Sequence, residues 1–500
     1  MHRTALVGMG LDIVARRIAH RTHHARAGRL GPALACGVLM GLLAAPAAAA
    51  PPAGFDGHQV VHIVVRDALD IDTVRGLQAL GDDFEVWSDV IKPGLVEVRV
   101  APAALPMLDF SGLEYAVVVP DLQAYLNDAF GGPDVAGFFD TLRTYDEHVQ
   151  FMQQLVATYP DLVSMVNLGL SVEGRPLWAL RLTGPGYAKP TVFYHGAEHG
   201  NESATSSIVA YIANHLLTNY QTNPQVAALV DRVEWVLLPI MNPDGYVRNR
   251  RYNAHNVDLN RNWDGPGAGQ DPSGGPYPFS EPETQHLRNL ILAEPGIRVH
   301  VDLHGYVPWI MWVWGHIPDH CPEHATYLQL GGQMRDRIAA AGGGTYDIGT
   351  IYEVAYPVSG CSTNYSYAIG GRWAFGIEVR NNTMPAICQQ FLNAMLYLGE
   401  WIRSYDCNAN GVPDAQDILA GTSTDVNHNG IPDECEGVGD VNCDYAVDFG
   451  DINPFVLALT NPGGYQQQYP NCPLPNRDIN GDGLVNFGDI NPFVRLLTSP

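Results

Sequence analysis

The sequence predicts an α/β fold in which a mixed, mostly parallel sheet is flanked by helices. A small α+β module precedes this sheet, and an acidic repeat tail follows it. Helical stretches alternate with apolar strands over residues 138–405. Residues 58–125 begin with alternating apolar positions and continue with further strand-like and helical stretches. Residues 406–500 are repetitive and rich in Asn, Asp and Gly. With 500 residues, 46% hydrophobic and 16% charged, the chain can bury a sizeable core and is long enough for about three domains.

Residues 1–50 have the order of a signal peptide. A basic stretch precedes an apolar run at 34–45, and small residues follow at 47–50. This order predicts cleavage near Ala50 and a secreted, extracellular protein. The apolar run is short for a membrane span, and a retained signal anchor is the alternative. The basic residues before the run are Arg16, Arg17, Arg21, Arg26 and Arg29.

Residues 54–128 form the predicted α+β module. Its strand-like segments are "HQVVHIVV", "LVEVRV" and "YAVVV", and its helical stretches are Asp70 to Leu80 and Ala101 to Leu108. A linker with Gly131, Gly132 and Pro133 separates this module from the next domain.

Residues 138–405 form the predicted central domain. Its apolar strands are "LWALRL", "PTVFYHG", "VEWVLLPIM", "RVHVDLHG" and "WAFGIEVR", with helices at 141–159, Glu202 to Leu217 and Ala386 to Ser404. Near-continuous apolar strands indicate a parallel sheet that is covered on both faces. In such sheets, binding and catalytic sites form at the C-terminal ends of the strands.

Residues 406–500 contain a duplication and four acidic loops. The segment "DFGDINPFVLALT" recurs 38 residues later as "NFGDINPFVRLLT". Each loop places oxygen-bearing side chains at offsets 1, 3, 5, 9 and 12, a spacing that suits several structural Ca²⁺ ions. These predicted calcium ligands are Asp406, Asn408, Asn410, Asp414, Asp417, Asp425, Asn427, Asn429, Asp433, Glu436, Asp440, Asn442, Asp444, Asp448, Asp451, Asp478, Asn480, Asp482, Asn486 and Asp489.

The tail resembles two known kinds of calcium-binding module. Residues 406–436, with "NGVPD" and "NGIPD", resemble thrombospondin type 3 repeats. Residues 437–500, with two copies of "FGDINPFV", resemble a dockerin. The second resemblance implies a cohesin-like or cell-surface scaffold partner.

The formal net charge of −25 excludes nucleic acid as a partner, because its phosphates need clustered Lys and Arg.

The segment "PTVFYHGAEHGNES" contains two overlapping His-x-x-Glu pairs, His195 with Glu198 and His199 with Glu202. Either pair can hold one metal ion from a loop that enters a helix. Catalytic zinc takes three protein ligands and leaves a position open for water. His304, at the end of the apolar strand "RVHVDLHG", is the candidate for the third ligand, and the spacing alone leaves the choice of pair open.

Five ordered blocks resemble the M14 family of zinc metallocarboxypeptidases, of the carboxypeptidase A/B type. The blocks are "SVEGRPLWALRLTG", "YHGAEHGNE", "LLPIMNPDGYVRNRRYNAHNVDLNRNWDG", "IYEVAYPVSGCSTNYSY" and "FGIEVR". The resemblance covers residues 138–405, and it implies one catalytic zinc in a zinc carboxypeptidase-like fold. Residues 54–128 are similar to the activation propeptide of that family, which implies a zymogen opened by an activating protease between roughly Leu126 and Phe139.

The resemblance assigns the metal ligands and the groups that act on the peptide bond. It places His199, Glu202 and His304 on the zinc and leaves His195 and Glu198 as bystanders. Glu378 matches the general base, and an acid between two apolar strand residues needs such a reason. The cation beside the developing oxyanion is Arg251, with Arg250 as the alternative. Asp258 matches the outer group that orients a zinc histidine, here His199.

The resemblance also assigns the residues that bind substrate. Asn260 and Arg261 match the pair that holds the terminal carboxylate, for which Arg offers two parallel donors. Tyr356, rather than Tyr352, matches the tyrosine that closes over the substrate. Thr363 takes the position that sets side-chain preference, where an acid would favour basic residues, so a neutral, apolar or mixed preference is expected. Asn364 replaces a frequent Asp of the family.

Seven of the eight cysteines remain after cleavage. Cys407, Cys435, Cys443 and Cys472 form an even set in the tail, whereas Cys321, Cys361 and Cys388 leave one thiol over.

The predicted function is that of a secreted zinc metallocarboxypeptidase that hydrolyses the C-terminal bond of peptides or proteins through a zinc-activated water. The alternatives are a zinc amidohydrolase acting on cell-wall peptides and an inactive, scaffold-docked binding protein.

Overall fold

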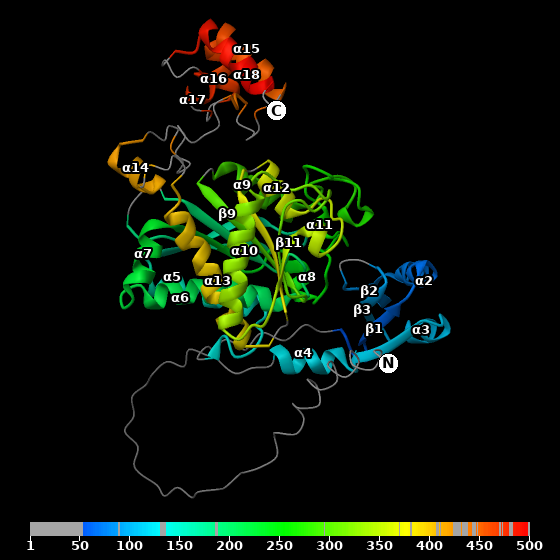
Figure 1. The fold of residues 1–500 in the computed structure, drawn as a ribbon. Helices are drawn as coiled ribbons and strands as arrows, with labels where there is room; N and C mark the ends of the chain where they lie inside the picture. The colour runs from blue at the N-terminus through cyan, green and yellow to red at the C-terminus, as the bar shows by residue number, and fades with distance from the viewer. Residues whose placement is uncertain are drawn as a thin grey trace, which may run out of the picture. The chain divides into compact units, whose positions relative to one another are not determined.

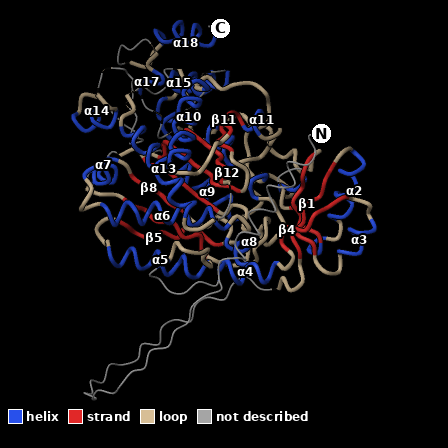
Figure 2. The backbone as a smooth tube through the Cα atoms, turned by 60° about the horizontal axis from the view of Figure 1, so that its bottom comes forward, coloured by secondary structure: helices blue, strands red, loops and turns tan. Residues whose placement is uncertain are grey.

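The computed structural model describes residues 54–88, 91–130, 137–185, 189–294, 296–369, 371–380, 383–406, 410, 412–423, 432, 439–442, 447, 449–469, 472, 474–479 and 484–498. The predicted signal peptide and the linker at 131–133 lie outside these residues. Figure 1 shows the described helices and strands, and Figure 2 shows that the strands form two separate sheets.

The larger sheet has eight strands in the order β11-β10-β12-β9-β7-β8-β6-β5. Its middle is parallel, because β12 pairs with β9, β9 with β7, and β7 with β8 in the same direction. The pairs β5–β6, β6–β8 and β10–β12 are antiparallel, and β10–β11 is parallel. The strands are β5 Val163–Leu170, β6 Pro176–Leu182, β7 Thr191–Gly196, β8 Glu234–Leu238, β9 Ile297–Gly305, β10 Trp309–Trp312, β11 Asp347–Thr350 and β12 Trp373–Val379.

Alternate residues of the central strands face opposite sides of the sheet. In β9, Val299, Val301 and Leu303 pack into the main core with helices on one face. His300, Asp302 and His304 therefore point to the other face, where polar side chains of several strands meet. This alternation explains why a strand with eight consecutive buried residues contains three residues capable of binding metal or protons.

Helices cover both faces of the larger sheet. α6 and α13, which contact each other, and α10 pack on the face that holds the main core (Figure 1). The second face is covered by α9, α12 and the segment that follows β8. The helices of this domain are α5 Tyr145–Thr158, α6 Ser203–Asn219, α7 Pro224–Arg232, α8 Pro243–Val247, α9 Pro282–Ala293, α10 His324–Ala340, α11 Ile351–Val354, α12 Ser362–Ala368 and α13 Ala386–Arg403.

The mixed, mostly parallel α/β arrangement agrees with the prediction. Some observed helices begin a few residues later than predicted, because capping residues set their first turns. Thr144 and Glu147 form a reciprocal cap, so α5 begins at Tyr145, although apolar and polar residues with helical spacing start earlier. The helix predicted from Glu202 begins at Ser203, because Glu202 occupies the cap position.

The N-terminal module has a four-stranded antiparallel sheet in the order β2-β3-β1-β4. Its strands are β1 Gln59–Val65, β2 Phe84–Val86, β3 Gly94–Val100 and β4 Glu114–Val119, and its helices are α2 Ala68–Gln78, α3 Leu105–Phe110 and α4 Leu122–Phe130. The module has its own apolar core. Within the sheet, Arg99 donates from Nε and Nη2 to the buried carboxylate of Glu85, at 3.0 and 2.8 Å.

The tail contains short helices, α14 Asp414–Ala420, α15 Ile452–Thr460, α16 Pro462–Gln468, α17 Leu474–Arg477 and α18 Ile490–Thr498. Phe455 and Phe493, which occupy equivalent places in the two repeats, pack together in a small core with Tyr465. Among the described residues, no helix combines the length and the apolar character needed to cross a bilayer. Cys472 is in a disulfide, whereas the three cysteines of the central domain, Cys321, Cys361 and Cys388, are buried free thiols.

Candidate metal centre and active site

The loop between β7 and α6 carries His199 and Glu202. Ala197 turns the chain with a φ of 50°, directly after the last strand residue. At Gly200 the backbone passes so close to α8 that a Cβ would lie 2.1 Å from the carbonyl carbon of Gly245. Only glycine fits there, and this close approach fixes the two side chains on either side of it.

His199, Glu202 and His304 converge on one point. Nδ1 of His199 lies 2.8 Å from Oε1 of Glu202, and Nδ1 of His304 lies 3.2 Å from Oε2 of the same carboxylate. The two Nδ1 atoms are 3.2 Å apart, and all three side chains are buried. Two histidines and one carboxylate are a ligand set of catalytic zinc sites, which keep one position for water. The donors therefore fit a single zinc ion.

His304 and Glu378 are neighbours on adjacent strands. β9 and β12 run parallel, and their register pairs His304 with Glu378 at the C-terminal ends of both strands. Both side chains line the same pocket, and Glu378 is buried. The register thus places a carboxylate beside the metal ligands without making it one of the three converging donors.

Asp258 and Arg251 hold the other side of His199. Oδ1 of Asp258 lies 3.2 Å from Nε2 of His199, while Arg251 donates from Nε to Oδ2 at 2.9 Å. Burial alone would raise the pKa of Asp258, but Arg251 and then His199 outweigh burial and hold that pKa well below its ordinary value. Asp258 is therefore an ionised acceptor that fixes the ring of His199.

The three arginines of residues 248–251 lie in different environments. Nη1 of Arg251 lies 3.3 Å from Nδ1 of His199, so this guanidinium is beside the metal ligands. Arg250 instead reaches Asp82 of the N-terminal module at 2.7 Å and Asn256 at 2.9 Å. Arg248 pairs with Glu173, away from the ligands. The structure thus brings Arg251, and not Arg250, beside the metal ligands.

A pocket beside the ligands holds the predicted substrate-binding residues. Nη2 of Arg261 donates to the Tyr356 hydroxyl at 3.2 Å, and the Oδ1 of Asn260 accepts from the Ser362 amide at 3.1 Å. Thr363 also lines the pocket, and its hydroxyl would be 3.3 Å from a Cβ added at Gly376. The pocket is lined by Asn260, Arg261, His304, Trp309, Met311, Ile351, Ala355, Tyr356, Val358, Cys361, Thr363, Gly376 and Glu378.

Asn364 points away from the predicted site residues. Its Oδ1 accepts from the Gly315 amide at 3.0 Å, and its Nδ2 lies 3.4 Å from Nδ1 of His316. This side chain holds the loop after β10.

Behind His304 lies a buried polar layer made of Asp302, Ser362 and Glu198, of which the family resemblance had left Glu198 as a bystander. Oδ2 of Asp302 is 2.9 Å from Nε2 of His304 and accepts from the Ser362 hydroxyl at 2.5 Å. Glu198 accepts from Nε1 of Trp263 at 2.9 Å. Burial and then the charge of Asp302 raise the pKa of Glu198 well above its ordinary value. The even spacing of residues 300, 302 and 304 along one strand was the signal that could have revealed this layer.

Several predicted calcium ligands lie outside the described residues, namely Asn408, Asp425, Asn427, Asn429, Asp433, Glu436, Asp444, Asp448, Asn480 and Asp482. Of the others, Asp417, Asp451 and Asp489 occupy the last loop position and are buried. Oδ1 of Asp451 accepts from the amides of Val441 and Asn442, at 2.7 and 3.0 Å. In the described part of the chain, clusters of three His, Cys or acidic donors occur around His304 alone.

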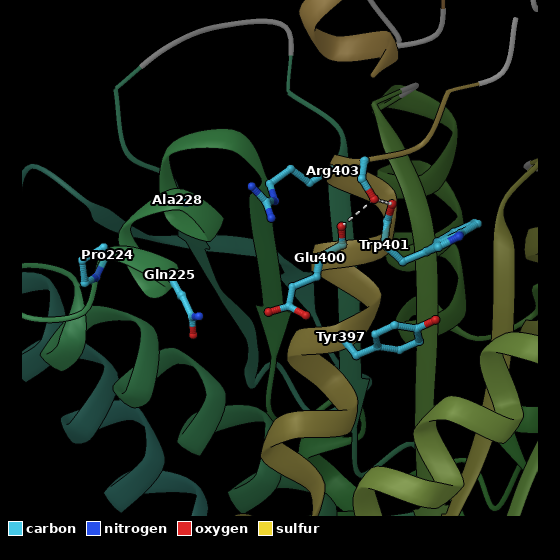
Figure 3. A pocket seen from close by; sticks show the side chains of 8 residues that line it. Pro224, Gln225, Ala228, Tyr397, Glu400, Trp401 and Arg403 are labelled. Carbon is cyan, nitrogen blue, oxygen red and sulfur yellow. Dashed lines mark hydrogen bonds between the residues drawn. The ribbon is translucent and has the colours of Figure 1, made fainter. Parts of the chain in front are cut away.

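A second hollow lies on the surface between α7 and α13, with a volume of about 670 Å³ (Figure 3). Its lining residues are Pro224, Gln225, Ala228, Tyr397, Glu400, Trp401, Arg403 and Ser404. It contains one carboxylate and no histidine, so it offers no set of metal ligands.

A mixed α/β sheet with two histidines and one glutamate at the C-terminal ends of its strands defines the class of zinc-dependent hydrolases. Comparisons with known proteins narrow this class. The sequence profile of the zinc carboxypeptidases, peptidase family M14, matches residues 148–395. Rat carboxypeptidase A2 is 31% identical over 366 residues, which cover 65% of this chain and 87% of the relative. Mouse carboxypeptidase A1 is 26% identical over 364 residues, with the same shares covered.

Two solved structures share the fold. Thrombin activatable fibrinolysis inhibitor superposes with a TM-score of 0.61 and 19% identity, covering 69% of this chain and 98% of that one. Carboxypeptidase A from Helicoverpa armigera gives a TM-score of 0.56 and 24% identity, covering 69% and 96%.

The chain belongs to the M14 family of zinc carboxypeptidases. It is a metallocarboxypeptidase, a hydrolase that acts on peptide C-termini with one catalytic zinc.

Proposed function

We propose that this metallocarboxypeptidase is secreted and removes the C-terminal residue of peptides or proteins, with Glu378 as general base. The pairing of Glu378 with His304 across β12 and β9, in the pocket that also contains Asn260 and Arg261, carries the catalytic part of this proposal. The signal-peptide order of residues 1–50 supports secretion. A base beside the metal ligands and a cationic fork at the pocket wall are the two requirements of this reaction.

Each side chain has a separate task in the proposed mechanism. When bound by His199, Glu202 and His304, zinc supplies a Lewis acid that polarises the carbonyl and makes water a better nucleophile near neutral pH. Glu378 takes the proton of the attacking water and returns it to the leaving nitrogen. Arg251, beside His199, stabilises the negative charge that develops on the carbonyl oxygen.

Asn260 and Arg261 select for a chain end. The guanidinium of Arg261 offers parallel donors that match a terminal carboxylate, and its contact with Tyr356 links carboxylate binding to the tyrosine that covers the pocket. An amidated C-terminus lacks this charge. The fork therefore favours the carboxypeptidase over the amidohydrolase alternative, and the complete set of polar groups argues against an inactive binding protein.

The pocket favours apolar or neutral C-terminal side chains. Met311, Ile351 and Val358 contribute apolar walls, and Thr363 provides the only hydroxyl near Gly376 among the described lining residues. A Lys or Arg side chain would be buried there without a carboxylate partner at Thr363, which costs several kcal/mol. Comparing kcat/KM for peptides that end in Phe, Leu, Lys and Glu tests this preference.

Contacts of the N-terminal module support a zymogen. Oε1 of Glu85 accepts from the backbone amide of Arg251 at 3.2 Å, next to the proposed oxyanion cation. Lys92 donates to the Ala355 carbonyl at 3.2 Å and lies 5.3 Å from the ring of Tyr356. The Lys92 contacts reach two residues that line the pocket, so removal of the module by an activating protease is proposed to open the site.

The tail is proposed to bind calcium and to dock to a cohesin-like or cell-surface scaffold. The two repeats expose the same apolar residues 38 positions apart: Phe449 and Phe487 are 74% and 78% exposed, Ile452 and Ile490 39% and 37%, and Val456 and Val494 49% and 50%. Exposed apolar side chains at equivalent positions indicate a contact surface rather than chance. Binding to a panel of cohesins, with Ca²⁺ and with a calcium chelator, tests this proposal.

The decisive experiment uses trypsin-treated protein and peptides with free or amidated C-termini, with and without a zinc chelator. Release of one residue from free C-termini, abolished by the chelator, is the expected result. Equal cleavage of amidated peptides would overturn the carboxypeptidase assignment, and chelator-resistant activity would overturn the metal site.

A further inference from the structure

The two zinc histidines present the same ring nitrogen to the metal site. Nδ1 of His199 and Nδ1 of His304 both face the carboxylate of Glu202 and each other. Each ring therefore turns its Nε2 outward. A histidine that binds metal through one nitrogen usually donates the hydrogen of the other, and the acceptor fixes the tautomer.

The acceptors of the two rings differ in kind. Nε2 of His199 meets Asp258, whose charge is shared with the guanidinium of Arg251. Nε2 of His304 meets Oδ2 of Asp302 at 2.9 Å, and the hydroxyl of Ser362 donates to that same oxygen at 2.5 Å.

Asp302 has little freedom to move. It is buried at 0% exposure on the polar face of β9, two residues before His304. Its other oxygen lies 3.4 Å from Nδ1 of His195. Glu198, from the rejected His-x-x-Glu pair, lies 3.6 Å from Nε2 of His304. The carboxylate is thus held by neighbouring groups and aimed at the edge of the His304 ring.

We propose that Asp302, held by Ser362, is a positioning residue that fixes the ring orientation and tautomer of His304 and thereby sets the affinity for zinc. This inference rests on the zinc site proposed above. An aspartate that accepts from the outer nitrogen keeps Nδ1 free of hydrogen and makes the imidazole a stronger ligand. Packing alone does not require a carboxylate here, because burying a charged group costs free energy unless it has partners.

Nε2 of His304 also lies 3.1 Å from the side-chain amide nitrogen of Asn260. The ring nitrogen can donate to Asp302 or accept from Asn260, but it cannot do both. Oδ1 of Asn260 already accepts from the Ser362 amide, which turns the Nδ2 of Asn260 toward the ring. A charged acceptor makes the stronger bond, so the hydrogen belongs on Nε2 and points to Asp302.

Glu198, Asp302 and His304 could also hold a second cation, because one donor atom of each lies within 4.8 Å of the others. In that case His304 would bridge two ions and Asp302 would be a ligand. The metal content of the protein separates the two arrangements, because positioning requires one zinc per chain and bridging requires two.

The test measures the zinc dissociation constant of the full chain by competition with a chromophoric chelator, in the parent and in Asp302→Asn. The amide cannot accept with the strength of a carboxylate, and we expect the dissociation constant to rise roughly 10- to 100-fold. Ser362→Ala leaves Asp302 in place but releases one of its oxygens, and we expect a rise of roughly two- to tenfold.

Two further aspartate variants serve as controls for the zinc dissociation constant. Asp258→Asn changes the corresponding carboxylate of His199 and should weaken zinc binding to a similar extent. Asp244→Asn changes a fully buried aspartate that also accepts from a serine, at 2.8 Å from Ser171, but is outside the metal site. It should shift the dissociation constant less than threefold. Circular dichroism of the zinc-free variants checks that each chain is folded.

The outcomes are distinct. If Asp302→Asn and Ser362→Ala bind zinc as the parent does while Asp258→Asn binds it more weakly, the inference is overturned and the proposed function stands. Two zinc ions per chain would replace positioning by bridging. If Asn260→Ala weakens zinc binding as much as Asp302→Asn, the hydrogen is not where we place it. A parent chain that binds no zinc would defeat the proposed function itself.

Discussion

Glu378 pairs with His304 in the register of β12 and β9, so the proposed base and a metal ligand stand side by side at the ends of two parallel strands. The neighbouring strand β10 runs antiparallel and places Trp309 on the other side of Glu378. A carboxylate between an apolar wall and a metal site can hold a proton during the reaction, because bulk water does not compete with it.

Replacing Glu378 with Gln should lower kcat by roughly 10²- to 10⁴-fold, because the amide cannot accept the proton of the attacking water. The zinc content should stay at the parent's level, since Glu378 is not among the converging donors. Steady-state kinetics with a free-C-terminal peptide and metal analysis together check this. The control is Glu400→Gln, in the surface hollow between α7 and α13, which should keep full turnover. Full turnover in Glu378→Gln would remove the proposed base.

Replacing Arg261 with Lys should raise KM for peptides with a free C-terminus roughly 10- to 100-fold, with a smaller change in kcat. Lys offers a point charge in place of the two parallel donors and cannot keep the contact to Tyr356. Arg335, a partly exposed arginine of α10 that pairs with Asp336, supplies the matched control Arg335→Lys. An unchanged KM in Arg261→Lys would mean that the terminal carboxylate binds elsewhere.

The sheet and the metal ligands were accessible to sequence reasoning for definite physical reasons. In strand 297–305 apolar residues alternate with polar ones, and the last polar residue, His304, lies at the C-terminal end, where sites form in parallel sheets. The spacing of the first motif did not choose between its two pairs. In the structure both pairs are buried within a few ångströms, with His199 and Glu202 in front of His304 and Glu198 behind it.

Other features could not be predicted because they depend on side-chain direction. Arg250 and Arg251 are adjacent in sequence, yet the first points to Asp82 and the second to Asp258. Asp302 shares a face with His304 by simple alternation, but its contact with Ser362 depends on how α12 packs on the sheet. Long-range contacts of this kind have no local pattern.

His148 should make the protein less stable in acid. Burial, and then the nearby charge of Arg143, lower the pKa of His148 to about 3. In the unfolded chain this histidine takes up a proton below about pH 6.5, whereas the folded chain resists protonation until about pH 3. The unfolded state therefore binds more protons in this window, and stability falls as pH decreases, by about 1.4 kcal/mol per pH unit.

Urea denaturation between pH 4 and 7 measures this effect. His148→Gln keeps a donor toward Ser206 but does not titrate, so the variant should lose less stability on acidification than the parent. His286→Gln, at a half-buried position in α9, is the control for the substitution itself. If His148→Gln and the parent lose stability in parallel, another group causes the acid sensitivity.

Glu85 should control the activity of the uncleaved chain. Its carboxylate is paired with Arg99 and also accepts from the amide of Arg251, so it joins the N-terminal module to the segment of the proposed oxyanion cation. Glu85→Gln removes the charge but keeps the shape. The module should then hold the site less tightly, and basal turnover without protease treatment should rise several-fold, while turnover after treatment stays the same.

The matched control is Glu97→Gln, on the strand next to Glu85 and paired with His62 at 2.9 Å within the module. It should leave basal turnover at the parent's level. Turnover of a small peptide before and after trypsin, with gel analysis of the cleaved chain, gives the comparison. Equal basal rates in Glu85→Gln and the parent would show that the contact with Arg251 does not restrain the site, and that inhibition depends on other contacts such as Lys92 at the pocket rim.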